Sequence, residues 1–234
     1  MRTVRWGRRT RRLGALAGAL GLVAGLVLGC ASARPPVAGA LVQASDAGDA
    51  LRVYDALEDL IAAGRDTLAD RQYAYEQVRQ HEQDTAAYTF ARAAVTGRLV
   101  QVVGLRGAAL VHDVEHYARR SRELDPHFRD GAATRLLGTL YVIAPARLLE
   151  HGDSEEGLAM LEELAARRPD VVENHLRLAE AYVALGDPIP AAPHLCACLS
   201  GETMLRRDDR ELLSELLGRG SRLRCTAAAA LGPR

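Results

Sequence analysis

The chain has 234 residues and a formal net charge of zero, but its charges are unevenly placed. Its 30 basic residues are all arginine, and residues 1–29 contain several of them and no acidic residue, so the remainder is acidic on balance. This balance excludes a generally basic nucleic-acid-binding protein, and we expect no nucleic acid among its partners. The abundance of Ala, Leu, Arg and Glu favours helices over an all-β fold.

The first 29 residues have the pattern of a bacterial export signal. Residues 1–12 are basic, and residues 13–28 form an apolar run that is shorter than the roughly 20 residues needed to span a bilayer core. The run ends in Val27-Leu28-Gly29-Cys30, which resembles the lipobox of bacterial lipoproteins. The resemblance implies cleavage before Cys30, lipidation of its sulfur and stable anchoring by more than one acyl chain. An ordinary signal peptide or a short membrane anchor is the alternative.

These features predict four segments along the chain. We expect a lipoprotein signal peptide at 1–29, a tether at 30–45, a helical domain at 46–220 and a C-terminal tail at 221–234. The tether is expected because residues 31–44 are mostly small and include two adjacent prolines. The residue after Cys30 is alanine rather than aspartate, which favours the outer membrane. The expected location is therefore the cell envelope, lipid-anchored and facing the periplasm.

Amphipathic patterns predict helices through the rest of the chain. In chain order, we expect helices at 51–62, 66–83, 85–103, 108–123 and 131–142, one that begins after the N-cap Asp153 and ends before Pro169, one from Val172 to Gly186, one through Ala191 and Cys198, and a closing helix at 210–217. The first two helices match no repeat.

An internal repeat is clearest at residues 172–199. Leu178-Ala179 and Tyr182 share one face of a first helix, and Leu137-Gly138 and Tyr141 have the same spacing further upstream. Small and large apolar residues at these offsets resemble the tetratricopeptide (TPR) repeat, a helix–turn–helix unit. The predicted fold class is therefore all-α, a TPR-like helical-hairpin solenoid of about four degenerate repeats with a closing helix. An irregular helical bundle with a chance repeat is the alternative.

A narrower resemblance depends on small residues, prolines and an insertion of about seven residues within 144–152, relative to the standard repeat. The residues that carry it are Gly131-Ala132, Leu137-Gly138-Thr139-Leu140-Tyr141, Ala144-Pro145, Gly152-Asp153, Leu161, Pro169, Glu173-Asn174-His175 and Leu178-Ala179-Glu180. Across residues 84–200 the sequence is similar to the T-component family of TRAP-type transporters, which are lipid-anchored periplasmic TPR proteins.

This resemblance implies a membrane-anchored periplasmic TPR binding protein, a ligand- or subunit-binding accessory component of a TRAP-type uptake system. The implied partner is a periplasmic solute-binding subunit or envelope complex, and a hydrophobic small molecule is a further implied ligand. The resemblance implies neither catalysis nor a cofactor. The alternative function is a TPR scaffold lipoprotein for envelope assembly or secretion.

Binding in a TPR-like array is expected on the concave face, which the first helix of each pair lines, and on the inserted loop. The expected residues are Thr89, Arg135, Thr139, Leu148, Leu149, Glu173, Leu176 and Glu180. The two leucines are included because apolar residues in a loop are expected to be buried against something. A solvated face without a ligand is the alternative.

The segment from His112 to His116 reads H-x-x-E-H, a pattern known from zinc peptidases. Two histidines four residues apart share a helical face and could hold one zinc, with Glu115 as general base. The segment falls where a repeat helix is expected, however, and a third ligand is not evident. We therefore predict that it is structural, that the chain is not an enzyme, and that it holds no catalytic metal; a weak adventitious metal site is the alternative.

Besides Cys30, the chain has three cysteines. Cys196 and Cys198 are two apart on a predicted helix and point about 200° apart, so they cannot easily pair with each other. Cys198 takes a buried position of the repeat, whereas Cys196 is expected to be more exposed. We therefore expect a disulfide between Cys196 and Cys225, with Cys198–Cys225 as the alternative.

Overall fold

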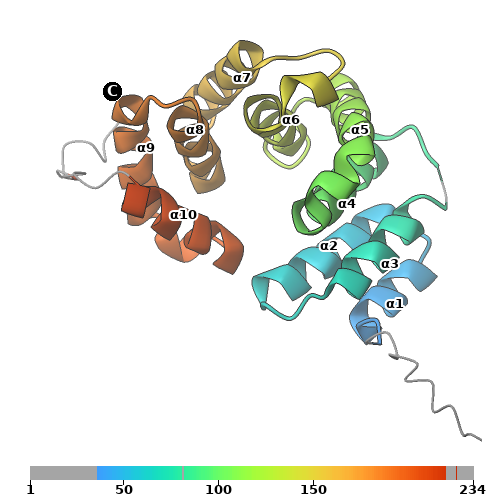
Figure 1. Cartoon of the computed structure of the whole chain (residues 1–234). Coiled ribbons are helices and arrows are strands. Elements are labelled where there is room, and N and C mark those ends of the chain that lie inside the picture. Colours follow the sequence, from blue (N-terminus) through green and yellow to red (C-terminus); the bar gives the residue numbers. More distant parts are fainter. Residues whose placement is uncertain (1–35, 81, 220–224, 226–234) are drawn as a thin grey trace, which may run out of the picture. The chain divides into compact units, whose positions relative to one another are not determined.

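The computed structural model describes residues 36–80, 82–219 and 225. All regular elements in this part of the chain are helices, which confirms the prediction of an all-α fold (Figure 1). The α-helices are α1 (Gly39–Asp46), α2 (Ala50–Ala62), α3 (Leu68–Val78), α4 (Ala86–Val103), α5 (Val111–Leu124), α6 (Ala132–Ile143), α7 (Ser154–Arg167), α8 (Val172–Ala184), α9 (Pro188–Ser200) and α10 (Arg207–Arg219). The 3-10 helices are η1 (Gly104–Leu110), η2 (Ala146–Leu148) and η3 (Glu202–Met204).

Successive helices from α4 to α9 pack as three hairpins, α4 with α5, α6 with α7 and α8 with α9. The first helices of the hairpins also contact one another, because α6 packs against both α4 and α8. We call α4, α6 and α8 the inner layer; in Figure 1 they lie on the inner side of the row of hairpins, and α5, α7 and α9 lie on the outer side. At the two ends of the inner layer, α2 packs on α4 and α10 packs on α8, and α10 also contacts α2.

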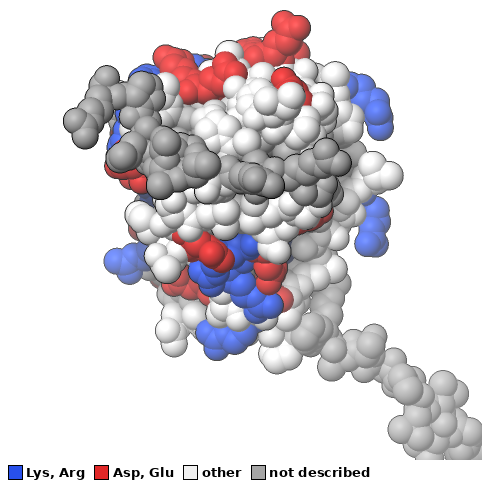
Figure 2. All heavy atoms as spheres, turned by 90° about the vertical axis from the view of Figure 1, so that its left-hand side faces the viewer, with Lys and Arg blue, Asp and Glu red and all other residues white. Residues whose placement is uncertain are grey.

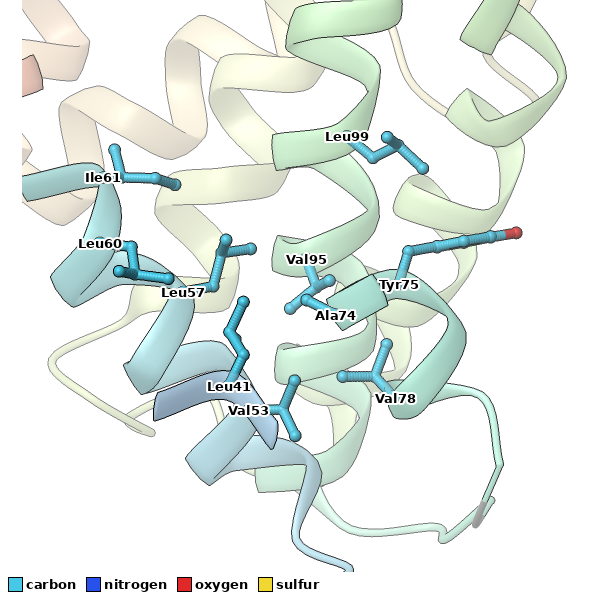
Figure 3. Close-up of a cluster of buried hydrophobic side chains, with 10 residues drawn as sticks. All are labelled: Leu41, Val53, Leu57, Leu60, Ile61, Ala74, Tyr75, Val78, Val95 and Leu99. Carbon is cyan, nitrogen blue, oxygen red and sulfur yellow. The ribbon is translucent and has the colours of Figure 1, made fainter. Parts of the chain in front are cut away.

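The first part of the core joins α1, α2, α3 and α4, as Figure 3 shows. Leu41 and Leu57 are completely buried there, and Val78 and Val95 pack with them. The expected tether at 30–45 is therefore wrong for its second half, since residues 39–45 belong to α1. The small residues of this segment suggested an extended linker, but Leu41 gives the helix an apolar anchor in the core.

Two glycines allow the α6–α7 hairpin to pack closely. A Cβ atom at Gly138 would lie 3.0 Å from the carbonyl oxygen of Gly157, and one at Gly157 would lie 2.7 Å from the carbonyl oxygen of Gly138. The contact at Gly157 is closer than a carbon atom tolerates against a backbone oxygen, and the one at Gly138 would force the backbones slightly apart. The backbones therefore approach this closely because neither residue has a side chain. The small residue at position 138, which is part of the repeat pattern, has this packing role.

Side-chain caps define where several of these helices begin. Asp153 accepts hydrogen bonds from the amides of Glu155 and Glu156 at the start of α7, as the sequence predicts. Thr67 and Asp70 form a capping box that starts α3. This box places the start of α3 at Leu68, two residues later than expected. The helix also ends earlier, at Val78, so it is shorter at both ends than the expected 66–83.

Within the described residues, one continuous helical stretch, Ala86–Leu124, is long and apolar enough to cross a membrane by length and composition alone. It comprises α4, η1 and α5. Because α4 and α5 pack against each other, this stretch is a hairpin of the folded core.

Candidate functional site

The structure distributes the expected concave-face residues over α4, α6 and α8 of the inner layer. Two of them do not line a surface. Thr89 is 2% exposed and its hydroxyl donates to the carbonyl oxygen of Thr85, and Leu176 is fully buried in the core between α8, α9 and α10. The expectation that Thr89 and Leu176 contact a ligand is therefore wrong. Both were placed by helical spacing alone, which does not register how neighbouring helices pack on the inner layer, as α10 does over Leu176.

Arg135, Thr139 and Ile143 remain partly exposed on α6 and recur every four residues, so they share one face of this helix. Ile143 is half exposed. The hydroxyl of Thr139 donates to the carbonyl oxygen of Arg135 at 2.8 Å. This face therefore offers a guanidinium at one end and an apolar side chain at the other.

Arg135 has an unusual set of partners for a partly buried arginine. Its Nη1 donates to Oδ1 of Asn174 on α8 at 2.7 Å, and no carboxylate of the described residues lies within ion-pair distance. Burial lowers the pKa of its guanidinium, and the negative charge of Glu173 opposes this effect. An arginine in this position is held in place by an amide but is not neutralised, which suits it to bind an added carboxylate.

The other inner-layer arginines are paired with acidic residues. Arg98 of α4 binds both carboxylate oxygens of Glu58 on α2, at 2.6 and 2.7 Å, and its Nη1 lies 3.0 Å from Asp208 of α10. Arg206 reaches the same Glu58 carboxylate at 3.0 Å. Burial opposes the charged form of Arg98, but hydrogen bonds and attraction from Glu58 and Asp208 outweigh it and raise the guanidinium pKa. Through these ion pairs, α2 and α4 at one end of the inner layer are connected to Arg206 and α10 at the other end.

A second group of charges joins α8 to α10. Arg177 binds Glu180 at 2.9 Å on its own helix and Asp209 of α10 at 2.5 Å. Burial raises the pKa of Asp209, although Arg177 favours its ionised form. Glu180 is therefore occupied by an internal ion pair, whereas Glu173, one helical turn before Arg177, makes no ion pair with the described residues.

The surface shown in Figure 2 has acidic side chains gathered at the top, the level at which α7 lies in Figure 1. Four glutamates of α7 are exposed: Glu155, Glu156, Glu162 and Glu163. Lower on the same face, basic and acidic side chains are interleaved, so this face has no large patch of a single sign.

The inserted loop at 144–152 is docked against α5. The buried carboxylate of Glu115 accepts hydrogen bonds from the amides of Glu150, at 2.7 Å, and His151, at 2.8 Å. Leu149 packs on the core between α4, α5, α6 and α7, while Leu148 is half-buried in η2. The loop follows the C-terminal end of α6, about 14 Å along the helix from Arg135 at 1.5 Å per residue. The structure thus places Leu148 and Leu149 of the loop apart from Arg135 of the inner layer, and the two groups do not form one site.

The H-x-x-E-H segment lies on α5, but its three side chains serve different contacts. The rings of His112 and His116 stack with centroids 6.4 Å apart, and His112 also contacts the carboxylate of Glu150. Glu115 is 1% exposed, and its carboxylate is engaged by the amides of the loop. Among the described residues, no group of three His, Cys, Asp or Glu side chains is arranged to hold a metal ion.

In the structure Cys196 forms a disulfide with Cys225, with their Cα atoms 5.4 Å apart. Cys196 is 5% exposed and Cys198 0%, so Cys196 is the more exposed cysteine of α9, as expected, although both are buried. Cys198 is a fully buried free thiol, and burial raises its pKa to about 12. The expected lipidation site Cys30, the signal peptide and most of the C-terminal tail lie outside the described residues.

No protein-family model matches the sequence, and no curated protein matches it significantly.

The sequence interpretation missed the ion pairs that involve Glu58, Arg98 and Asp208. A signal for them is present, because Glu58 lies among the apolar residues of α2 and Arg98 lies in the apolar second half of α4. Isolated charges within apolar helical stretches are buried only when they are paired. Their partners could not be identified, because 40 residues separate Glu58 from Arg98 and 148 separate it from Arg206.

Proposed function

We propose that this chain is a TPR-like, lipid-anchored binding protein of the cell envelope that acts as an accessory subunit of a TRAP-type uptake system. In this proposal it holds an acidic segment of a periplasmic protein partner on the α6 face formed by Arg135, Thr139 and Ile143. The observation that carries the proposal is the state of Arg135, a partly buried inner-layer arginine with an amide partner and no carboxylate of the described residues within ion-pair distance.

The TPR-like part of the proposal is supported by the order of packing. Three consecutive hairpins contact one another in sequence, and the first helix of each hairpin contributes to one inner layer. A repeat array is expected to show this nearest-neighbour pattern. The close approach of Gly138 and Gly157 at a repeat position supports the same interpretation.

The binding part is supported by the rigidity of the scaffold around α6. Ion pairs connect α2, α4, α8 and α10 through Arg98 and Arg177, so the helices on both sides of α6 are fixed by charged contacts as well as by the apolar core. A site on regular helices that are held in this way is preorganised, which reduces the entropy cost of binding. The envelope location is supported by the basic and apolar leader that ends at Cys30.

Site-directed photo-crosslinking in native envelopes tests the proposal. A photoreactive residue replaces Thr139 on the proposed face or, as a matched control, Ala166, an exposed small residue of the outer helix α7. We expect a specific crosslink from position 139, and not from position 166, to a solute-binding or permease subunit. A crosslink from 139 to secretion or cell-wall assembly proteins would support the scaffold alternative instead. Absence of a specific crosslink at 139 would reject this face as the partner site.

A further inference from the structure

A groove at the edge of the helical array, on the side where α5 turns into α6, is separate from the inner-layer face. It has a volume of about 490 Å³ and is lined by residues from the end of α5, the α5–α6 turn, the start of α6 and the end of α7. Pockets that bind small molecules typically have volumes of about 300–1,000 Å³. The groove is thus large enough for a small ligand.

The charged residues that line the groove leave an excess of positive charge. Arg168 pairs with Asp130 at 2.6 Å, and Arg167 pairs with Glu163 at 3.1 Å. Arg122, in the last turn of α5, also lines the groove and has no ion-pair or hydrogen-bond partner among the described side chains. The two acidic residues are therefore already matched by arginines, and Arg122 remains available for an anion.

The start of α6 forms another side of the groove and presents unused donors. No side chain caps this helix, and the amides of Ala133 and Thr134 have no hydrogen-bond acceptor among the described residues. The first amides of a helix attract anions, because they lack partners within the helix and carry the positive end of its dipole.

Thr134 provides an observation that is independent of the helix terminus. Its side chain is 5% exposed and lines the groove, and its hydroxyl makes no hydrogen bond with any described residue. Its oxygen is not one of the enclosed side-chain atoms without a partner, so the hydroxyl is open to the groove and can donate a hydrogen bond to a bound group. An oxyanion in the groove would accept from this hydroxyl and from Arg122.

We propose that this groove binds the carboxylate or phosphate group of a small free anion, held by Arg122 and by the hydroxyl and the free backbone amide of Thr134 at the start of α6. The planar guanidinium can donate two parallel hydrogen bonds to either group. This site is distinct from the Arg135 face and does not depend on the proposed protein partner. It can therefore be tested on the purified chain alone.

Isothermal titration calorimetry of the full-length chain in detergent, at fixed ionic strength, provides the test. Inorganic phosphate and succinate are the two anionic probes, which distinguish a phosphate ligand from a carboxylate ligand, and succinamide is the uncharged control. We expect saturable binding of at least one anion and none of succinamide. Arg122→Gln and Thr134→Val should each weaken that binding about tenfold or more, as loss of one charge-assisted hydrogen bond predicts.

Arg106→Gln is the matched control, because Arg106 is exposed in η1 and lies outside the groove. It should bind the anion as the wild type does. Thr134→Val preserves side-chain shape, and circular dichroism of each variant verifies folding. Failure of both anions to bind, or wild-type binding by a folded Arg122→Gln or Thr134→Val variant, would overturn the proposal. An equal loss in Arg106→Gln would also overturn it, because the attraction would then be general and not local.

Discussion

Glu58 of α2 and Arg206, directly before α10, form an ion pair at 3.0 Å although 148 positions separate them in the sequence. Glu58 is 3% exposed and also receives both hydrogen bonds from Arg98. One buried carboxylate thus connects the beginning, the middle and the end of the folded chain.

Replacement of Glu58 by glutamine should lower the free energy of unfolding by about 3 kcal/mol, because the buried Arg98 would keep only Asp208 as a counter-charge. The partly exposed Arg206 would also lose its partner. Chemical denaturation measures this change. The control is Asp84→Asn, which removes the carboxylate of an exposed pair with Arg120 and should change the stability far less, because solvent screens this pair. Equal stability of the two variants would show that the Glu58 cluster does not hold the terminal helices.

Glu115 should stabilise the protein at neutral pH through its bonds to the inserted loop. Burial acts to raise its pKa, but the amides of Glu150 and His151 outweigh burial, so the folded-state pKa lies below the ordinary value. Its contribution is therefore fully present above the ordinary glutamate pKa and is lost as the pH falls through the lower folded value. We expect Glu115→Gln to cost about 1–3 kcal/mol at pH 7 and progressively less in acid.

Denaturation of both proteins between pH 7 and pH 3 measures this difference. A variant as stable as the wild type at pH 7 would mean that the loop is held by other contacts. A stability difference that grows in acid would contradict the assigned direction of the pKa shift.

His175 and His194 form a pair with pH-dependent stability. Their Nδ1 atoms lie 2.9 Å apart, so one ring must donate and the other must accept, and Nε2 of His175 bonds to the carbonyl oxygen of Pro169. Burial, and secondarily the charge of His175, lowers the pKa of His194 to about 4, and Glu162 opposes this. The unfolded chain thus takes up a proton at a higher pH than the folded chain, so stability falls as the pH decreases from about 6.5 to about 4.

Replacement of His194 by glutamine should remove this component, which solvent screening of the partly exposed ring makes smaller than the pKa shift alone implies. Thermal unfolding at a series of pH values measures it. His116→Gln is the control, because His116 is exposed on α5. An unchanged pH profile in His194→Gln would assign the acid sensitivity to other groups.

The disulfide between Cys196 and Cys225 should stabilise the native state by restricting the unfolded chain. For a closed loop set by a sequence separation of 29, the chain-entropy model gives about 3–4 kcal/mol. We expect reduction to lower the melting temperature of the wild type but not that of a Cys196→Ser variant. Peptide mapping under non-reducing conditions should show Cys196 linked to Cys225 and Cys198 free; a Cys198–Cys225 peptide would contradict the observed pairing.

The sequence predicted the helices well where apolar spacing and caps agree, as at Asp153, where the predicted cap is the observed one. It failed at α1, a short segment that resembled a linker in sequence but that packs on α2 and α3 through Leu41. Helical spacing also placed Leu176 and Thr89 on a surface that other helices cover. Positions on the inner layer could be listed from the repeat, but which of them stay open depends on where α2 and α10 pack.

The groove beside Thr134 was not predictable for a related reason. Its lining residues come from three helices and a turn, and no local pattern marks Arg122 as unpaired. Arg135, in contrast, was expected on the inner face from its spacing, and the structure adds what the sequence lacks, namely that Asn174 is its partner.

If Arg135 binds an acidic group of a protein partner, its loss should weaken the affinity for the partner that crosslinks at position 139. Isothermal titration of the wild type, Arg135→Gln and the control Arg106→Gln compares the three proteins under the same conditions. We expect Arg135→Gln, verified as folded, to bind the partner at least about tenfold more weakly, as loss of one charge-assisted hydrogen bond predicts. Arg106→Gln should bind it like the wild type. Unchanged affinity in Arg135→Gln, or an equal loss in Arg106→Gln, would contradict this role of Arg135.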